Sequence, residues 1–219
     1  MAGWLYRWGR WPLGLIFAAA CVATAVYAFG YLYGSYSPRN PFAARFAVSG
    51  LDVPAHFFGA GLALLLAPVQ VWGWLRRRAP GLHRLAGWLY AAAVLIGGIA
   101  GLLLAPKAQG GWASGAGFAL LAPVWLLSTG LGIAYAVRGE LERHRRWMWR
   151  SIALTFAAVT LRLILGIGMG VLHLRFLPVY IFAAWACWSI NLVLCELLLY
   201  LQAWRQRRVP VQPSFAAAG

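Results

Sequence analysis

Six long apolar runs, separated by short polar connections, make up most of this chain. They lie near residues 11–34, 52–75, 84–105, 113–137, 147–173 and 178–203. About 20 apolar residues in an α-helix match the thickness of the hydrocarbon core of a bilayer. The pattern therefore predicts an all-α, polytopic membrane helical bundle with six transmembrane helices. We expect a single domain over residues 1–208, because the connections leave no room for a separate soluble domain, and a disordered cytoplasmic tail over residues 209–219.

The basic residues follow the same alternation of runs and connections. The net charge is +15, with 63% hydrophobic and 11% charged residues. Of the 19 Lys and Arg residues, 14 flank connections on one side of the predicted membrane, four lie on the other, and Arg162 lies within a run. The positive-inside rule then places both termini in the cytoplasm. Orientation, together with attraction to anionic lipid headgroups, accounts for these charges, so nucleic-acid binding is not expected.

An internal repeat links the second and fourth runs. Residues 59–69 read GAGLALLLAPV, and residues 115–124 read GAGFALLAPV, one leucine shorter. Each is followed by an arginine-rich turn and a His-Arg pair, at His83 and at His144, which opens the next run. This predicts two parallel helix-hairpin repeats, spans 2–3 and 4–5, related by a pseudo-twofold axis along the membrane normal. Pro68 and Pro123 should kink their helices at equivalent places.

Polar and sulfur-containing residues recur down one face of the fifth run. At about 100° per residue, seven of them fall within a wedge of roughly 60°. They are His144, Met148, Ser151, Thr155, Arg162, Met169 and His173. An arginine at the depth of Arg162 costs about 3 kcal/mol on insertion scales. We therefore expect Arg162 to face a partner or a hydrated cavity.

Two residues of the sixth run lie near the predicted level of Arg162. Asn191 is at a similar depth, and Glu196, the one acid in the interior of a run, lies about 7 Å deeper. Two explanations account for these polar residues. One is a structural pair that docks the sixth helix on the fifth, and the other is a cavity for an anionic or carbonyl-bearing ligand. The predicted ligand-binding residues are Arg162, Ser151, Thr155, Asn191 and Glu196.

This polar face leads to the main functional hypothesis. We expect a non-catalytic membrane subunit or small-ligand-binding protein, with a quinone, a lipid or an anion as ligand, within a larger assembly or a homodimer. A small transporter that uses the same face as its path is an alternative. No catalytic residue is predicted, because the sequence has no His-Glu-x-x-His zinc motif, phosphate-binding glycine loop or dinucleotide fingerprint.

The four histidines form two predicted layers. His83 and His144 lie on the cytoplasmic side, and His56 and His173 on the outer side. A pseudo-twofold axis would bring His83 and His144 face to face, and two imidazoles can ligate the iron of one b-type haem. The simpler alternative is interfacial histidines with hydrated tips and no metal. A second haem, at His56 and His173, would lie far from the first, because His144 and His173 are about 43 Å apart along a helix.

Three segments carry a resemblance to a known family: residues 80–90 (PGLHRLAGWLY), 144–151 (HRRWMWRS) and 153–162 (ALTFAAVTLR). With them, the region from His56 to Leu199 resembles the bacterial predicted membrane proteins called domain of unknown function 2306. The resemblance implies a multi-span bacterial protein of undefined activity and supplies no catalytic residue. We expect the protein in the bacterial inner membrane. A weaker similarity is to cytochrome b561-type proteins, which also have six spans. This chain departs from them, because its fourth span has no histidine.

Overall fold

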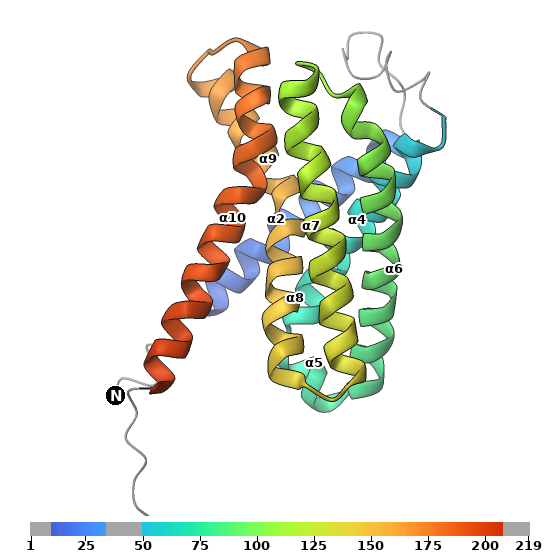
Figure 1. Cartoon of the computed structure of the whole chain (residues 1–219), viewed down its shortest axis with the longest axis vertical. Coiled ribbons are helices and arrows are strands. Elements are labelled where there is room, and N and C mark those ends of the chain that lie inside the picture. Colours follow the sequence, from blue (N-terminus) through green and yellow to red (C-terminus); the bar gives the residue numbers. More distant parts are fainter. Residues whose placement is uncertain (1–9, 34–49, 208–219) are drawn as a thin grey trace, which may run out of the picture.

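The computed structural model describes residues 10–33 and 50–207, which form helices and no strand (Figure 1). The helices are α2 (Arg10–Tyr33), α4 (Asp52–Val71), α5 (Gly73–Arg78), α6 (Pro80–Leu104), η1 (Ala105–Lys107), α7 (Trp112–Val137), α8 (Leu141–Thr155), α9 (Ala157–Leu165), η2 (Gly166–Val171) and α10 (Phe176–Arg207). Six of the resulting segments are long and apolar enough to cross a membrane. The predicted all-α, six-span architecture is thus confirmed, whereas the predicted tail lies outside the described residues.

The second span differs from its prediction. It was expected to run to residue 75, but α4 ends at Val71 and an extended residue, Trp72, separates it from α5. Pro68 lies three residues before this end, and a proline removes a helical hydrogen bond and crowds the preceding turn. In α7, by contrast, the helix continues from Pro123 to Val137. The helix thus ends soon after Pro68 in one hairpin and runs on well past Pro123 in the other, so the two hairpins differ beyond their prolines.

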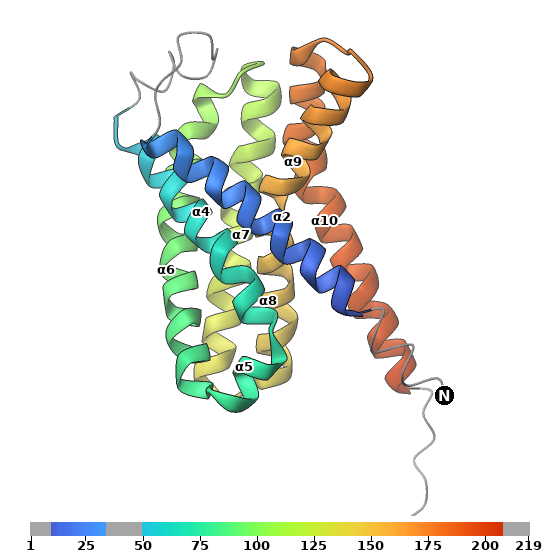
Figure 2. The same cartoon turned by 180° about the vertical axis from the view of Figure 1, so that it is seen from behind.

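Four helices form a ring in chain order. α4 packs on α6, α6 on α7 and α7 on α8, and α8 also meets α4. Figure 2 shows α2 crossing the outside of α4, and α10 tilting away from the ring. α2 also contacts α9. α10 packs on α7, α8 and α9. The end of the ring that carries α5 is called the α5 end, and the opposite one, which carries η1, the η1 end (Figure 1).

Glycines let the backbones of neighbouring helices touch. A Cβ on Gly59 of α4 would lie 2.5 Å from the backbone nitrogen of Gly97 of α6. A Cβ on Gly117 of α7 would lie 2.8 Å from the carbonyl oxygen of Ala184 of α10. Close packing of this kind is a main source of attraction between helices in a bilayer, because lipid tails are as apolar as the side chains and no hydrophobic force drives the helices together.

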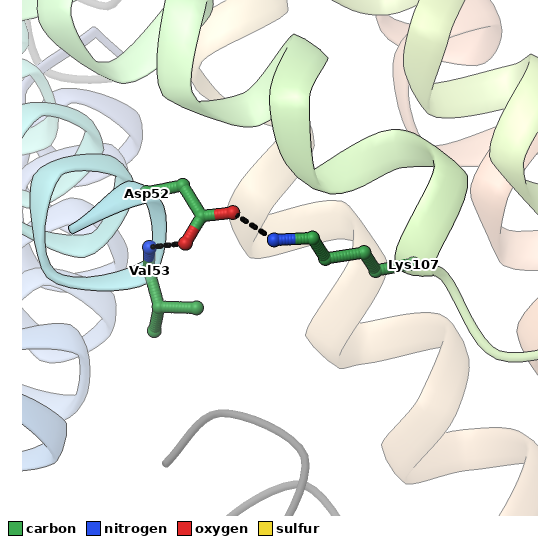
Figure 3. Close-up of polar contacts among 3 residues, drawn as sticks. All are labelled: Asp52, Val53 and Lys107. Carbon is green, nitrogen blue, oxygen red and sulfur yellow. Dashed lines mark hydrogen bonds and ion pairs between the residues drawn. The ribbon is translucent and has the colours of Figure 1, made fainter. Parts of the chain in front are cut away.

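Each of the four acids of the chain is engaged in an ion pair. Asp52 at the start of α4 pairs with Lys107 of η1 and accepts a hydrogen bond from its neighbouring backbone N–H at 3.0 Å (Figure 3). Glu196 of α10 forms a two-pronged pair with Arg150 of α8. The remaining pairs, at the start of α8, are Glu140 with Arg143 and Glu142 with Arg145.

The close approach of α4 and α6 gives a first prediction. Gly59→Ala should lower the free energy of unfolding by about 1–3 kcal/mol, because the added methyl group meets backbone that has no room to move. Gly130→Ala in α7 is the matched control, since a Cβ there meets nothing within 4 Å. Thermal unfolding in detergent measures both variants. Equal melting temperatures for the two would contradict the packing described here.

Candidate functional site

A cluster of buried hydroxyl groups joins three helices at the centre of the ring. The hydroxyl of Tyr90 (α6) lies 2.8 Å from Ser151 Oγ and 2.7 Å from Thr155 Oγ1, both on α8. From α7, the indole N–H of Trp125 donates to Thr155 Oγ1 at 2.9 Å, and Thr129 Oγ1 lies 2.6 Å from Ser151 Oγ. All five side chains are buried. We call these five residues the hydroxyl cluster.

Every hydrogen of the hydroxyl cluster finds an acceptor. The hydroxyls of Thr129 and Thr155 donate to the backbone carbonyls of Trp125 and Ser151, each at 2.9 Å. Ser151 then supplies the hydrogen for its contact with Thr129, and Tyr90 donates its single hydrogen to one of its two neighbours. Every polar hydrogen is thus bonded within these three helices, as a bilayer interior requires, and one of the two oxygen contacts of Tyr90 carries no hydrogen.

Ser151 and Thr155 were predicted to bind a ligand. They lie in the hydroxyl cluster, where their hydroxyls are used to hold α6, α7 and α8 together. Tyr90, Trp125 and Thr129 were not predicted from the sequence. Hydroxyl side chains within an otherwise apolar run, such as Thr129, were the available signal, but a single helix does not reveal which neighbour it faces.

The hydroxyl cluster also fixes the register of His83 and His144. His83 precedes Tyr90 by seven residues on α6, and His144 precedes Ser151 by seven residues on α8. Seven residues are about two turns, or about 10.5 Å, and return to nearly the same helix face. Since Tyr90 reaches Ser151, the two histidines face the same gap, closer to the α5 end. They are near enough for their charges to interact.

The two imidazoles differ in how the protein holds them. His144 Nδ1 lies 2.8 Å from the carbonyl oxygen of Gly132 in α7, so it donates its hydrogen there and presents Nε2 to other partners. His83 Nδ1 is buried and has no hydrogen-bond partner. In the described part of the chain, no group of three or more His, Cys, Asp or Glu residues is arranged to hold a metal ion. Ligation here would therefore rest on this pair.

Arg162 contacts different residues from those predicted. It was expected to face Asn191 or Glu196, but its guanidinium donates to the carbonyl oxygen of Ala158 at 2.7 Å and lies 4.9 Å from the ring centre of Tyr27 on α2. Its charge also reaches His56 on α4.

Asn191 and Glu196 instead dock α10 on the ring. Asn191 accepts a hydrogen bond from Thr160 at 3.0 Å and donates to the carbonyl of Ala153 at 3.1 Å. Glu196 holds Arg150. The five predicted ligand residues thus occupy three separate places rather than one cavity wall.

The winding of the fifth span explains this difference. The predicted polar face assumed a uniform α-helix, but α8 ends at Thr155 and α9 begins at Ala157. The Thr155 hydroxyl bonds the carbonyl four residues earlier, an arrangement that bends helices. Closer to the η1 end, η2 is a π-helix, in which Leu172 N–H bonds the carbonyl of Ile167. The break between α8 and α9 rotates the residues beyond it, so Arg162 faces α2 and α4 while Ser151 faces the ring interior. The π-helix rotates only the residues after η2, His173 among them.

His56 and His173, the predicted outer layer, have different surroundings. His56 Nδ1 lies 2.8 Å from the carbonyl oxygen of Gly97, and its ring fits against Gly101, where a Cβ would be 2.9 Å from the same nitrogen. His173 is exposed beyond η2 and has a φ of 51°, which is uncommon outside glycine.

These features define a helical membrane protein with a four-helix ring and two hairpins. The model of the family described as "Predicted membrane protein (DUF2306)" matches residues 53–199, and the chain belongs to that family. The match covers the ring and most of α10 but not α2. No curated protein and no solved structure matches the chain.

The hydroxyl cluster gives a second prediction. Tyr90→Phe keeps the ring but removes the oxygen that joins α6 to α8, so it should cost about 1–2 kcal/mol of stability. Tyr200→Phe, at a side chain that is 66% exposed, is the control. Unfolding of each variant in mixed micelles is compared with the unchanged protein. If Tyr90→Phe unfolds like Tyr200→Phe, the hydroxyl cluster does not hold the ring together.

Proposed function

We propose that this protein is a membrane electron-transfer protein that binds one b-type haem between α6 and α8, with His83 and His144 as the axial ligands. The observation that carries the proposal is the shared register of the two histidines. Both lie seven residues before a residue pair that is in hydrogen-bond contact across the ring, Tyr90 and Ser151. Two helices that meet there present both imidazoles to one gap.

The residues at this gap suit a haem group. A ligating histidine usually donates its second ring N–H to a carbonyl, which fixes the ring and leaves the other nitrogen for the metal. His144 has this arrangement with Gly132. The buried, unpartnered nitrogen of His83 is costly in a protein interior and favours a partner from outside the chain.

Other residues near the gap complete the proposed site. Bound haem would supply reversible one-electron transfer. Arg76 of α5 is near enough for its charge to reach His83, and a guanidinium at that edge suits carboxylate groups of a cofactor. The hydroxyl cluster closes the gap on the side towards the η1 end and keeps water from it, because its hydrogens are all used internally.

The other hypotheses have less support. A ligand site built from Arg162, Ser151, Thr155, Asn191 and Glu196 would need residues that lie in three places. A transporter would need a continuous polar path, and the polar face of the fifth span is interrupted after Thr155. Both stay predictions of the sequence, as does membership of a larger assembly or a homodimer.

We also propose an orientation in the bacterial inner membrane. The α5 end carries the arginine-rich connections, and the positive-inside rule favours it on the cytoplasmic side. The proposed haem would then lie in the cytoplasmic half of the bilayer, within reach of a soluble electron donor or acceptor.

The absorption spectrum of the purified protein tests the haem proposal. Protein expressed with ample haem should show a Soret band that shifts and sharpens when dithionite is added. His83→Ala and His144→Ala should each abolish the low-spin spectrum, because two imidazoles are needed. His173→Ala should leave it unchanged, since His173 is exposed outside the ring.

Each variant must elute as a single species in detergent, so that loss of colour is distinguished from loss of fold. Protein that is colourless despite ample haem would refute the proposal. So would a Soret band that survives both ring substitutions.

A further inference from the structure

We propose that the surface around α5 binds the phosphate of an anionic phospholipid through the guanidinium groups of Arg76 and Arg77. We call Trp72, Gly73, Trp74, Arg76 and Arg77 the headgroup surface. It lies where the second span ends, at the α5 end of the ring (Figure 1). The ligand lies on this open surface, at the level of the lipid headgroups, so no enclosed cavity is needed.

Two guanidinium groups converge over the glycine of the headgroup surface. A Cβ on Gly73 would lie 3.1 Å from Arg77 Nη1 and 3.8 Å from Arg76 Nη2. Both nitrogens therefore approach one point beside the backbone, which the missing side chain of Gly73 leaves open. Like charges this close repel each other, and an anion placed between them attracts both. Phosphate suits the position, because guanidinium groups bind its oxygens in a two-pronged geometry.

The chain offers no carboxylate side chain to these two arginines. All four of its Asp and Glu residues lie in the part that the structure describes, and each pairs with a different basic residue. The partners are Lys107, Arg143, Arg145 and Arg150. The anion that balances Arg76 and Arg77 therefore comes from outside the protein.

The position of the headgroup surface favours a membrane lipid over a soluble anion. Trp72 is 53% exposed and Trp74 is 52% exposed, and the centres of their rings lie 5.5 Å apart. Exposed indole rings at the end of a span are typical of the headgroup layer of a bilayer. Lipid phosphates occupy the same layer. The two tryptophans thus place Arg76 and Arg77 at the level of those phosphates.

The charge of the surroundings favours a lipid with a net negative charge. Arg78, Arg84 and Arg138 are exposed at the same end of the ring, and none of them takes part in the four ion pairs of the described residues. This positive field attracts the headgroup of phosphatidylglycerol, which carries one net negative charge. In phosphatidylcholine the choline adds a cation that the arginines repel. Binding should therefore select lipids by net charge, beyond the phosphate that both share.

Native mass spectrometry of the full chain in a neutral detergent tests the proposal, because it counts each bound lipid. Phosphatidylglycerol should bind at least about fivefold more tightly than phosphatidylcholine with the same acyl chains. Arg77→Gln should lose about fivefold in affinity for phosphatidylglycerol, the contribution of one interfacial arginine. Arg205→Gln is the matched control, since it removes the same charge from an exposed position on α10, and its affinity should be unchanged.

Gly73→Ala tests the convergence of the two guanidinium groups without changing any charge. Its methyl group would meet the flexible end of Arg77, which moves aside without disturbing the fold. The affinity for phosphatidylglycerol should therefore fall, while the melting temperature stays unchanged. Arg76 also belongs to the proposed haem site, so the variants change Arg77 and Gly73 instead.

Competition with inorganic phosphate distinguishes a lipid headgroup from a soluble anion. Millimolar phosphate should leave the bound phosphatidylglycerol in place. The proposal is overturned if inorganic phosphate displaces the lipid, or if phosphatidylcholine binds equally well. It is also overturned if Arg77→Gln binds like Arg205→Gln, or if Gly73→Ala binds like the unchanged protein. None of these outcomes depends on haem, so the two proposals fail separately.

Discussion

The need to satisfy hydroxyl groups where there is no water shapes the centre of this protein. Tyr90, Ser151, Thr129 and Thr155 are buried at a depth where bulk water does not reach. Each hydroxyl has at least one partner on a neighbouring helix, and Trp125 adds its indole N–H. Because these partners come from three helices, α6, α7 and α8 can meet in only a narrow range of registers. Slippage by one turn would leave several polar groups unsatisfied at once.

That register affects both ends of the four-helix ring. Towards the α5 end it aligns His83 with His144 two turns away. Towards the η1 end it sets where α8 can give way to α9, since Thr155 takes part both in the hydroxyl cluster and in the bond to its own helix. The change in winding then directs Arg162 outwards to α2 and α4. The hydroxyl cluster thus lies between His83 and His144, towards the α5 end, and Arg162, towards the η1 end.

The sequence was sufficient for the fold and insufficient for the site, for different physical reasons. Hydropathy over 20 residues is a sum of many small terms, so six spans emerge clearly even though single residues are ambiguous. The site depends on the angle of a few side chains. One bend beside Thr155 moves Arg162 away from Asn191. The expected pairing of His83 with His144 came from a shared signal, a His-Arg pair after an arginine-rich turn, and it stays a prediction. Tyr90 gave no such signal, since a tyrosine in an apolar run is as often a lipid-facing anchor as a core residue.

The π-helical segment Gly166–Val171 determines the direction in which the chain leaves the fifth span. A π-turn holds one residue more than an α-turn, so the chain beyond it is out of phase by about 100° with a regular helix. Three glycines in this segment make the wider turn easy to form. The loop before α10 therefore begins at an angle that a plain helix would not give, and Gly168 meets Val179 closely there. A single-residue deletion in this segment would rewind the helix and swing the start of α10 around the bundle, whereas the same deletion in the loop would only shorten it.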